Sequence, residues 1–235
     1  MSKVYLAVDT ATEACSVALS LDGSVLERFE VVNREHTQKL VPMLRSLLAA
    51  TGIGVAQLDG IACGVGPGSF AGVRIGVGLV KGLALARDLP VVGVSSLAML
   101  AQRAMRMRQA PRVAAVIDAR MSEVYCGAYR RGADGRAELE AAERVCAAEQ
   151  VPQLPADSWI GVGSGWAAYA DVLRRSFAAA FDDIDGAALP HAEDALHLAL
   201  PEFAAGRAIG SDALTPAYLR DNVALTLSEQ AALRR

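Results

Sequence analysis

The chain has 235 residues, enough for one or two domains with a buried core, and 53% of them are hydrophobic against 21% charged. A net charge of −3 at pH 7 gives no electrostatic basis for a stand-alone nucleic-acid-binding protein. The four cysteines are scattered without a CxxC pair, and we find no signal-peptide pattern or uninterrupted membrane span. We therefore expect a cytoplasmic protein that does not enter a membrane, with reduced, structural cysteines.

The first part of the chain alternates short apolar runs with helical patterns. The helix after Val94 is capped by Ser95 or Ser96 and extends to the arginine-rich stretch near Arg108. We predict strands at 4–8, 15–21, 24–32, 60–64 and 91–94, and helices at about 35–50 and 69–87.

The pattern restarts at Pro111. We predict strands at 113–117, 123–129, 136–146 and 159–162, and helices at about 166–181 and 192–206. In both halves a buried strand ends in Asp, and a short turn, a second strand and a DG-type turn follow. This repeat predicts a duplicated actin-like fold, of the sugar-kinase and Hsp70 type, with two α/β domains and mixed sheets. The domains are expected at 1–108 and 109–213, with the tail 214–235 returning to the first domain and ending in a polar helical segment.

The helix at 69–87 contains four glycines, Gly72, Gly76, Gly78 and Gly82. Each interior glycine costs a helix about 0.8–1 kcal/mol relative to alanine, so close contacts should offset the cost. The first two glycines share one helix face, and the last two share another face about 120° away. We expect one face to approach the protein's own sheet and the other a second helix; a single deeply buried helix is the alternative.

Three predicted turns have the composition of nucleotide-contacting turns. An Asp at a strand end can position Mg²⁺ or water, and turn hydroxyls and amides can hold phosphate. The same residues also occur in ordinary turns, and the glycine turn lacks the full GxGxxG pattern. The candidate residues are Asp9, Thr10 and Thr12 in the first turn, Asp118 and Arg120 in the second, and Gly161, Gly163 and Gly165 in the third. The turn 66–69 either binds an anion at a helix N-terminus or is only a tight turn.

Metal and hydrolase chemistry have little support in the sequence. His36 begins a helical face, but Leu40 occupies the position four residues on where a second metal ligand would stand. His191 and His197 lack that spacing as well. There is no GxxxxGK[ST] motif and no G-x-S-x-G motif. We therefore expect no metal site.

Five sequence runs together resemble the bacterial TsaB (YeaZ) family, and the resemblance covers essentially the whole chain. They are DTAT (9–12), HTQKLVP (36–42), GPGSFAGVRIG (66–76), DAR (118–120) with EVY (123–125), and PAYLR (216–220). The resemblance implies a role in making N6-threonylcarbamoyladenosine beside the anticodon of tRNAs that read codons beginning with A. It implies binding to the catalytic paralogue TsaD, joined by the ATPase TsaE. TsaD uses two metal-binding histidines four residues apart, and the matching positions here are His36 and Leu40, which implies a non-catalytic subunit.

The resemblance also implies that the helices 35–50 and 69–87 dock on TsaD. It implies that this chain binds no cofactor tightly, that ATP, Mg and metal are used by the partner subunits, and that tRNA is reached through the complex. Two alternatives stay open, a nucleotide-dependent kinase or ATPase and a peptidase acting on the partner, and the isolated chain is open to homodimerisation through the same helices. The expected docking residues are His36, Leu40, Leu44, Leu47, Gly72, Ile75, Gly76, Leu79 and Gly82.

Overall fold

The computed structural model describes residues 3–32 and 34–220. The polar helical end predicted within the tail lies in residues 221–235, outside the described part of the chain. In the described ranges, every helix is too short or too polar to cross a membrane.

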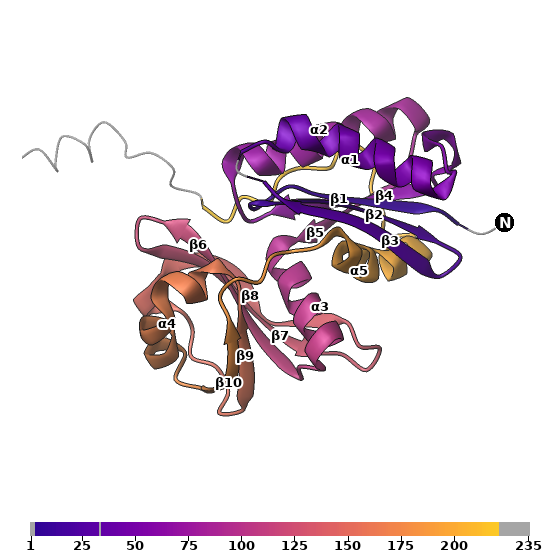
Figure 1. Cartoon of the computed structure of the whole chain (residues 1–235). Coiled ribbons are helices and arrows are strands. Elements are labelled where there is room, and N and C mark those ends of the chain that lie inside the picture. Colours follow the sequence, from indigo (N-terminus) through magenta and orange to yellow (C-terminus); the bar gives the residue numbers. More distant parts are fainter. Residues whose placement is uncertain (1–2, 33, 221–235) are drawn as a thin grey trace, which may run out of the picture.

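The first sheet has the strand order β3-β2-β1-β4-β5 (Figure 1). Its first three strands form an antiparallel meander, and β4 and β5 add parallel to β1. Asp22 and Gly23 have positive φ and close the β2–β3 hairpin, as the DG turn predicts. The strands are β1 (Tyr5–Asp9), β2 (Ala14–Leu21), β3 (Ser24–Val31), β4 (Gly60–Gly66) and β5 (Val91–Ser95).

The second sheet repeats this arrangement, because its order read from the β8 edge is β8-β7-β6-β9-β10. Again three antiparallel strands precede two that lie parallel to the central one. The two sheets separate between residues 95 and 112, so the predicted duplicated actin-like fold is confirmed. The strands are β6 (Arg112–Arg120), β7 (Glu123–Arg131), β8 (Ala137–Ala147), β9 (Ser158–Val162) and β10 (Ala180–Asp185).

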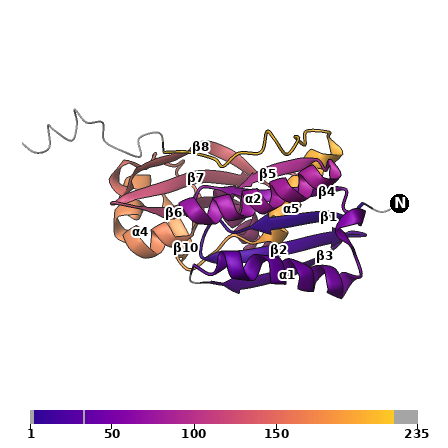
Figure 2. The ribbon, with the colours of Figure 1, turned by 90° about the horizontal axis from the view of Figure 1, so that it is seen from above.

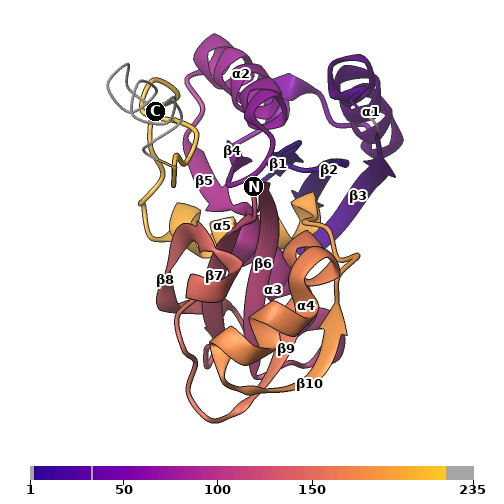
Figure 3. The same cartoon turned by 90° about the vertical axis from the view of Figure 1, so that its left-hand side faces the viewer.

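The helices make the molecule layered (Figures 1 and 3). On the first sheet, α1 and α2 cover one face and α5 the other; on the second sheet, α3 covers one face and α4 the other. The strands alternate accordingly: Leu6 and Val8 of β1 face α1 and α2, whereas Tyr5 and Ala7 face α5. The helices are α1 (His36–Thr51), α2 (Phe70–Arg87), α3 (Ser96–Arg108), α4 (Ser164–Phe177) and α5 (Ala192–Ala204), with short 3₁₀ turns η1 (Val55–Gln57) and η2 (Ala148–Gln150).

The halves exchange their last helices, which corrects the domain assignment expected from the sequence. Helix α3, expected in the first domain, places Leu97 and Leu100 against Val113 of β6. Helix α5, expected in the second, packs on the first sheet, where the Phe203 ring stacks on Tyr5 at 4.5 Å between centroids. Both helices therefore lie between the sheets and contact each other.

The predicted helix 166–181 is wrong at its C-terminal end. Helix α4 stops at Phe177, Ala178 adopts a left-handed conformation with φ 53°, and β10 follows. The sequence of β10, AFDDID, lies at a sheet edge with largely exposed or half-buried side chains. It therefore lacks the apolar alternation by which strands are recognised.

Most of the described part of the tail lies against the first half. Ile209 pairs with Val91, Leu214 is buried in the first core, and the Ala217 amide donates to the Val65 carbonyl at 2.8 Å. Arg220 then reaches the second half, where it donates to Glu123 at 2.6 Å. Figure 2 shows this yellow segment running along one side of the molecule past both sheets.

Candidate functional site

A cleft of about 610 Å³ lies between the two halves, where the turn after β1 faces the turn between β6 and β7. Its lining brings Thr12 together with Asp118 and Arg120, which lie more than a hundred residues further along the chain. Its walls also include residues that the sequence analysis did not predict, because they come from four different segments without a common motif: Glu13, Arg34, Tyr125 and Ser164.

The Asp9–Thr12 turn is largely closed by its own domain. Asp9 is fully buried; its Oδ1 accepts a 3.4 Å hydrogen bond from the Ala11 amide, while Oδ2 has no partner among the described residues. Burial raises the pKa of Asp9 to about 7. The Thr10 hydroxyl is buried too and donates to the Gly72 carbonyl at 2.7 Å. Only Thr12 of the three predicted residues lines the cleft.

Helix α2 begins directly against this turn. Ser69 caps the helix by accepting a hydrogen bond from the Gly72 amide at 3.3 Å, as predicted. A Cβ atom at Gly72 would lie 2.2 Å from the Thr10 carbonyl oxygen, and one at Gly76 would lie 2.7 Å from the Thr10 hydroxyl. The first glycine pair therefore serves the approach to the protein's own sheet, as one of the two expected faces.

The Asp118–Arg120 turn presents a charged pair to the cleft. Asp118 accepts from the Arg120 amide at 2.9 Å and from its guanidinium at 3.0 Å. The Asp118 amide in turn donates to the Ser164 hydroxyl at 3.1 Å. Three successive residues, Arg120, Met121 and Ser122, have positive φ, between 52° and 65°. This conformation is energetically unfavourable for residues other than glycine. The Asp118 carboxylate is thus already paired with the guanidinium of Arg120 in the same turn.

The glycines expected to form an adenosine-contacting turn are instead buried inside the second half. A Cβ at Gly161 would lie 2.6 Å from the Trp166 ring. At Gly163 and Gly165 it would lie 2.5 Å from the Val116 carbonyl oxygen and 2.4 Å from a Val116 methyl group. These glycines allow β6, β9 and α4 to approach closely, and they offer no open surface. A nucleotide contact at these three residues stays a prediction.

Helix α1 turns most of its predicted docking residues into the protein. Leu40, Leu44 and Leu47 are at most 5% exposed and belong to the first core. His36 is also buried; its Nε2 lies 3.2 Å from the Ala14 carbonyl oxygen, and the residue lines the cleft. Gly72 and Gly76 are covered by Thr10, as described above. In this conformation these six residues are not available to a partner, which corrects that part of the expected surface.

The second glycine pair is open. Nothing lies within 4 Å of a Cβ built at Gly78 or Gly82, and Leu85, one turn further along α2, is 77% exposed. Ile75 and Leu79 flank this face and are partly buried against the core. We call Gly78, Gly82 and Leu85 the open face of α2.

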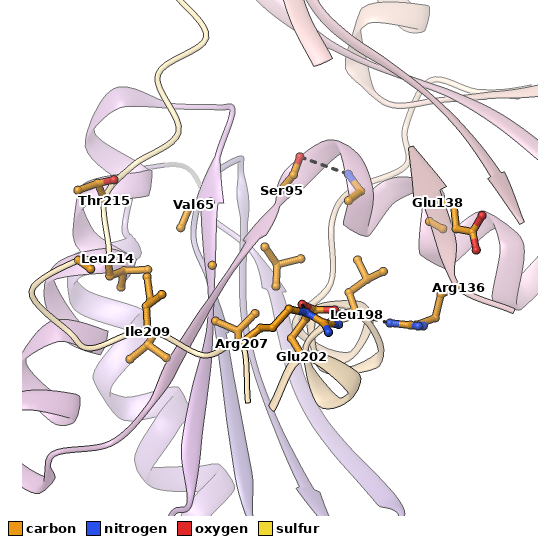
Figure 4. Close-up of a pocket in the computed structure, with 17 residues that line it drawn as sticks. Val65, Ser95, Arg136, Glu138, Leu198, Glu202, Arg207, Ile209, Leu214 and Thr215 are labelled. Carbon is orange, nitrogen blue, oxygen red and sulfur yellow. Dashed lines mark hydrogen bonds and ion pairs between the residues drawn. The ribbon is translucent and has the colours of Figure 1, made fainter. Parts of the chain in front are cut away.

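A second cavity of about 590 Å³ lies beside β5, between the end of α5, the start of β8 and residues 207–215 (Figure 4). Its apolar wall includes Val65 and Leu198. Its charged groups are paired with neighbours: Arg207 donates to Glu202 at 2.6 and 2.8 Å, and Arg136 lies 3.9 Å from Glu202. The sequence analysis did not predict this cavity, since its walls come from separate segments.

In the described ranges, no group of three or more His, Cys, Asp or Glu side chains is arranged to hold a metal ion.

Comparisons with known proteins agree over nearly the whole chain. A family model described as "TsaD: tRNA N6-adenosine threonylcarbamoyltransferase" matches residues 29–226. The "tRNA threonylcarbamoyladenosine biosynthesis protein TsaB" of Escherichia coli K12 is 46% identical over 93% of this chain and 95% of its own. The protein of the same name from Haemophilus influenzae is 42% identical over 93% and 94%. The solved structure of YeaZ from Pseudomonas aeruginosa is 46% identical, covers 92% of this chain and all of its own, and gives a TM-score of 0.86.

Proposed function

Because this chain belongs to the TsaB family, we propose that it is a non-catalytic subunit of the machinery that forms threonylcarbamoyladenosine in tRNA. In this proposal it binds and activates the catalytic paralogue TsaD, and the ATPase TsaE joins the pair. The tRNA is one that reads codons beginning with A, and it is reached through the complex. The chain itself binds no cofactor tightly, whereas the partner subunits use ATP, Mg and metal.

The non-catalytic role is supported by how the candidate catalytic positions are used. Leu40 stands where a second metal-binding histidine would be needed and is buried in the core. Asp118 is paired with Arg120, and Trp166 and Val116 occupy the space beside the glycines of the third turn. A nucleotide-dependent kinase or ATPase is the second candidate, favoured by the cleft between the halves. ATP turnover by the purified chain that Asp9→Asn abolishes would establish that candidate instead.

The docking proposal rests on one observation, the open face of α2. Gly78 and Gly82 carry the conformational cost of helical glycine, yet no group of this chain approaches them. A second helix backbone could approach there more closely than the 8–10 Å usual for larger side chains. The face is continued by exposed Leu85, and α2 lies on the same side of the molecule as α1, whose Val41 is 39% exposed (Figure 3). We therefore propose that the open face of α2, with the outer side of α1, receives TsaD.

Leucine substitutions on the open face test this proposal. Gly78→Leu and Gly82→Leu should leave the circular dichroism of the chain unchanged, since both side chains have room, but should block close helix approach. We expect co-purification with TsaD to fall at least tenfold and threonylcarbamoyladenosine to disappear from the tRNA of cells that carry only the variant. The matched control is Ala168→Leu, on an exposed position of α4 in the other half.

Unchanged TsaD binding by a folded Gly82→Leu chain would contradict the docking surface. Unchanged tRNA modification in cells without this protein would contradict the function itself. A homodimer of the isolated chain that both leucine variants disrupt would show that a second copy competes for the same face.

A further inference from the structure

Two of the four cysteines meet on neighbouring strands of the second sheet. The Sγ atoms of Cys126 on β7 and Cys146 on β8 lie 3.9 Å apart. In the strand register Cys146 is opposite Val124 and Cys126 is opposite Arg144, so the two thiols form a diagonal pair across adjacent strands. Diagonal positions are far apart for a side chain as short as cysteine, so the sulfur separation of 3.9 Å is what shows that these two thiols meet. The sequence places these cysteines 20 residues apart without any recognisable redox motif.

The two thiols differ in their access to solvent. Cys126 is 1% exposed and belongs to the core between the second sheet and α4. Cys146 is half-buried and is therefore the more exposed of the two residues. The pair has a more accessible member and a protected member in contact with it, which is the arrangement of a reacting and a resolving cysteine.

We propose that Cys126 and Cys146 are a reversible redox site, at which hydrogen peroxide oxidises Cys146 and Cys126 then closes a disulfide. The Cys146 thiolate attacks one oxygen of hydrogen peroxide and the O–O bond breaks. The leaving hydroxide takes up the proton that the thiol had lost, which gives a sulfenic acid and one water. The Cys126 sulfur then attacks the sulfenic sulfur, the S–S bond forms, and the hydroxyl leaves as a second water with the Cys126 proton. Two thiols lose two hydrogens, and the peroxide is reduced to water. A dithiol reverses the change by exchange through a mixed disulfide.

The surroundings favour Cys146 as the reacting thiol. The hydrogen bond from the Cys126 thiol lowers the pKa of Cys146, and the positive charge of Arg144 acts in the same direction, against burial and the negative charge of Glu123. The hydrogen bond to Cys146 and burial raise the pKa of Cys126. Since the thiolate is the nucleophile, oxidation should begin at Cys146.

The other two cysteines provide internal controls. Cys15 and Cys63 are fully buried in the first core, and burial raises the pKa of the Cys15 thiol to about 11. Burial likewise raises the pKa of Cys63. Neither should react with a peroxide while the chain is folded.

Mass spectrometry of the full chain treated with hydrogen peroxide tests the proposal. We expect the intact protein to lose two hydrogens and to regain them after reduction with dithiothreitol. After trypsin digestion without reduction, a disulfide should join the peptides 121–130 and 145–174, which contain Cys126 and Cys146. Cys15 and Cys63 should remain free thiols in the same digest.

Two variants separate the roles of the pair. Cys126→Ser should leave a sulfenic acid at Cys146 that a dimedone probe captures, because the resolving thiol is gone. Cys146→Ser should leave Cys126 unlabelled and unoxidised, because it is buried. If the folded wild-type chain gives no linkage between these peptides under peroxide, or gives linkages to Cys15 or Cys63 in equal amount, the proposal is wrong, whatever the variants do.

Discussion

At the scale of single residues, Asp9 makes the stability of the fold depend on pH. Its pKa is about 7 in the folded chain against 3.8 in the unfolded one, because burial disfavours the charged form. Between these values the folded state holds a proton that the unfolded state has lost, so stability falls as pH rises from about 4 to 7, by up to about 4 kcal/mol. The variant Asp9→Asn lacks this ionisation. Urea titrations at pH 4, 6 and 8 measure the free energy of unfolding of both proteins. The stability of the variant relative to the wild type should therefore increase with pH. A difference that stays constant with pH would contradict this account.

At the scale of elements, the two glycine faces of α2 should respond to alanine in opposite directions. Gly72→Ala places a Cβ 2.2 Å from the Thr10 carbonyl oxygen, so the turn or the helix must move. We expect a loss of about 1–3 kcal/mol in the free energy of unfolding, as for other overpacked sites. Gly82→Ala, its matched control, meets nothing within 4 Å and should gain up to about 1 kcal/mol from helix propensity. Urea unfolding of both variants measures the difference. Equal stabilities would mean that α2 does not approach the Asp9–Thr12 turn as closely as described.

At the scale of the whole molecule, the exchange of α3 and α5 should make the halves unfold together. The buried carboxylate of Asp194 on α5 forms ion pairs with Arg106 of α3 at 3.0 Å and with Arg103 at 3.5 Å. Ion pairs therefore also connect the two exchanged helices. Both tryptophans of the chain, Trp159 and Trp166, report on the second half, whereas far-ultraviolet circular dichroism reports on both. We expect coincident urea transitions by the two signals in the wild type. In Asp194→Ala, Arg103 and Arg106 of α3 lose the buried carboxylate that they share, and Arg106 keeps only its 2.6 Å ion pair with Glu193, so the transitions should separate. Separate transitions already in the wild type would show that the halves are independent domains.

The sequence by itself determined the family resemblance, the repeated strand pattern, the turns at 9–12 and 118–120, and the Ser69 cap. The structural features in this set are local: apolar alternation, DG turns and a capping serine act through neighbours in the chain, so they can be predicted without the fold. The two glycine faces of the helix at 69–87 could be predicted in the same way. The second sheet's edge strand β10 was not, because its exposed AFDDID sequence carries no apolar alternation.

Only the tertiary structure decided which element covers each apolar surface. The apolar pattern of α5 indicates that one side of the helix is buried. The pattern does not specify whether that side packs on the first sheet, as it does, or on the second. For the same reason Leu40, Leu44 and Leu47 were expected at a partner, although they face the protein's own core. The glycines of α2 indicate close contacts with another part of the protein or a partner. Only the structure shows that the first pair packs against Thr10 and that the second pair faces open space. The proximity of Cys126 and Cys146 depends on the register of β7 and β8, which no pattern within either strand encodes.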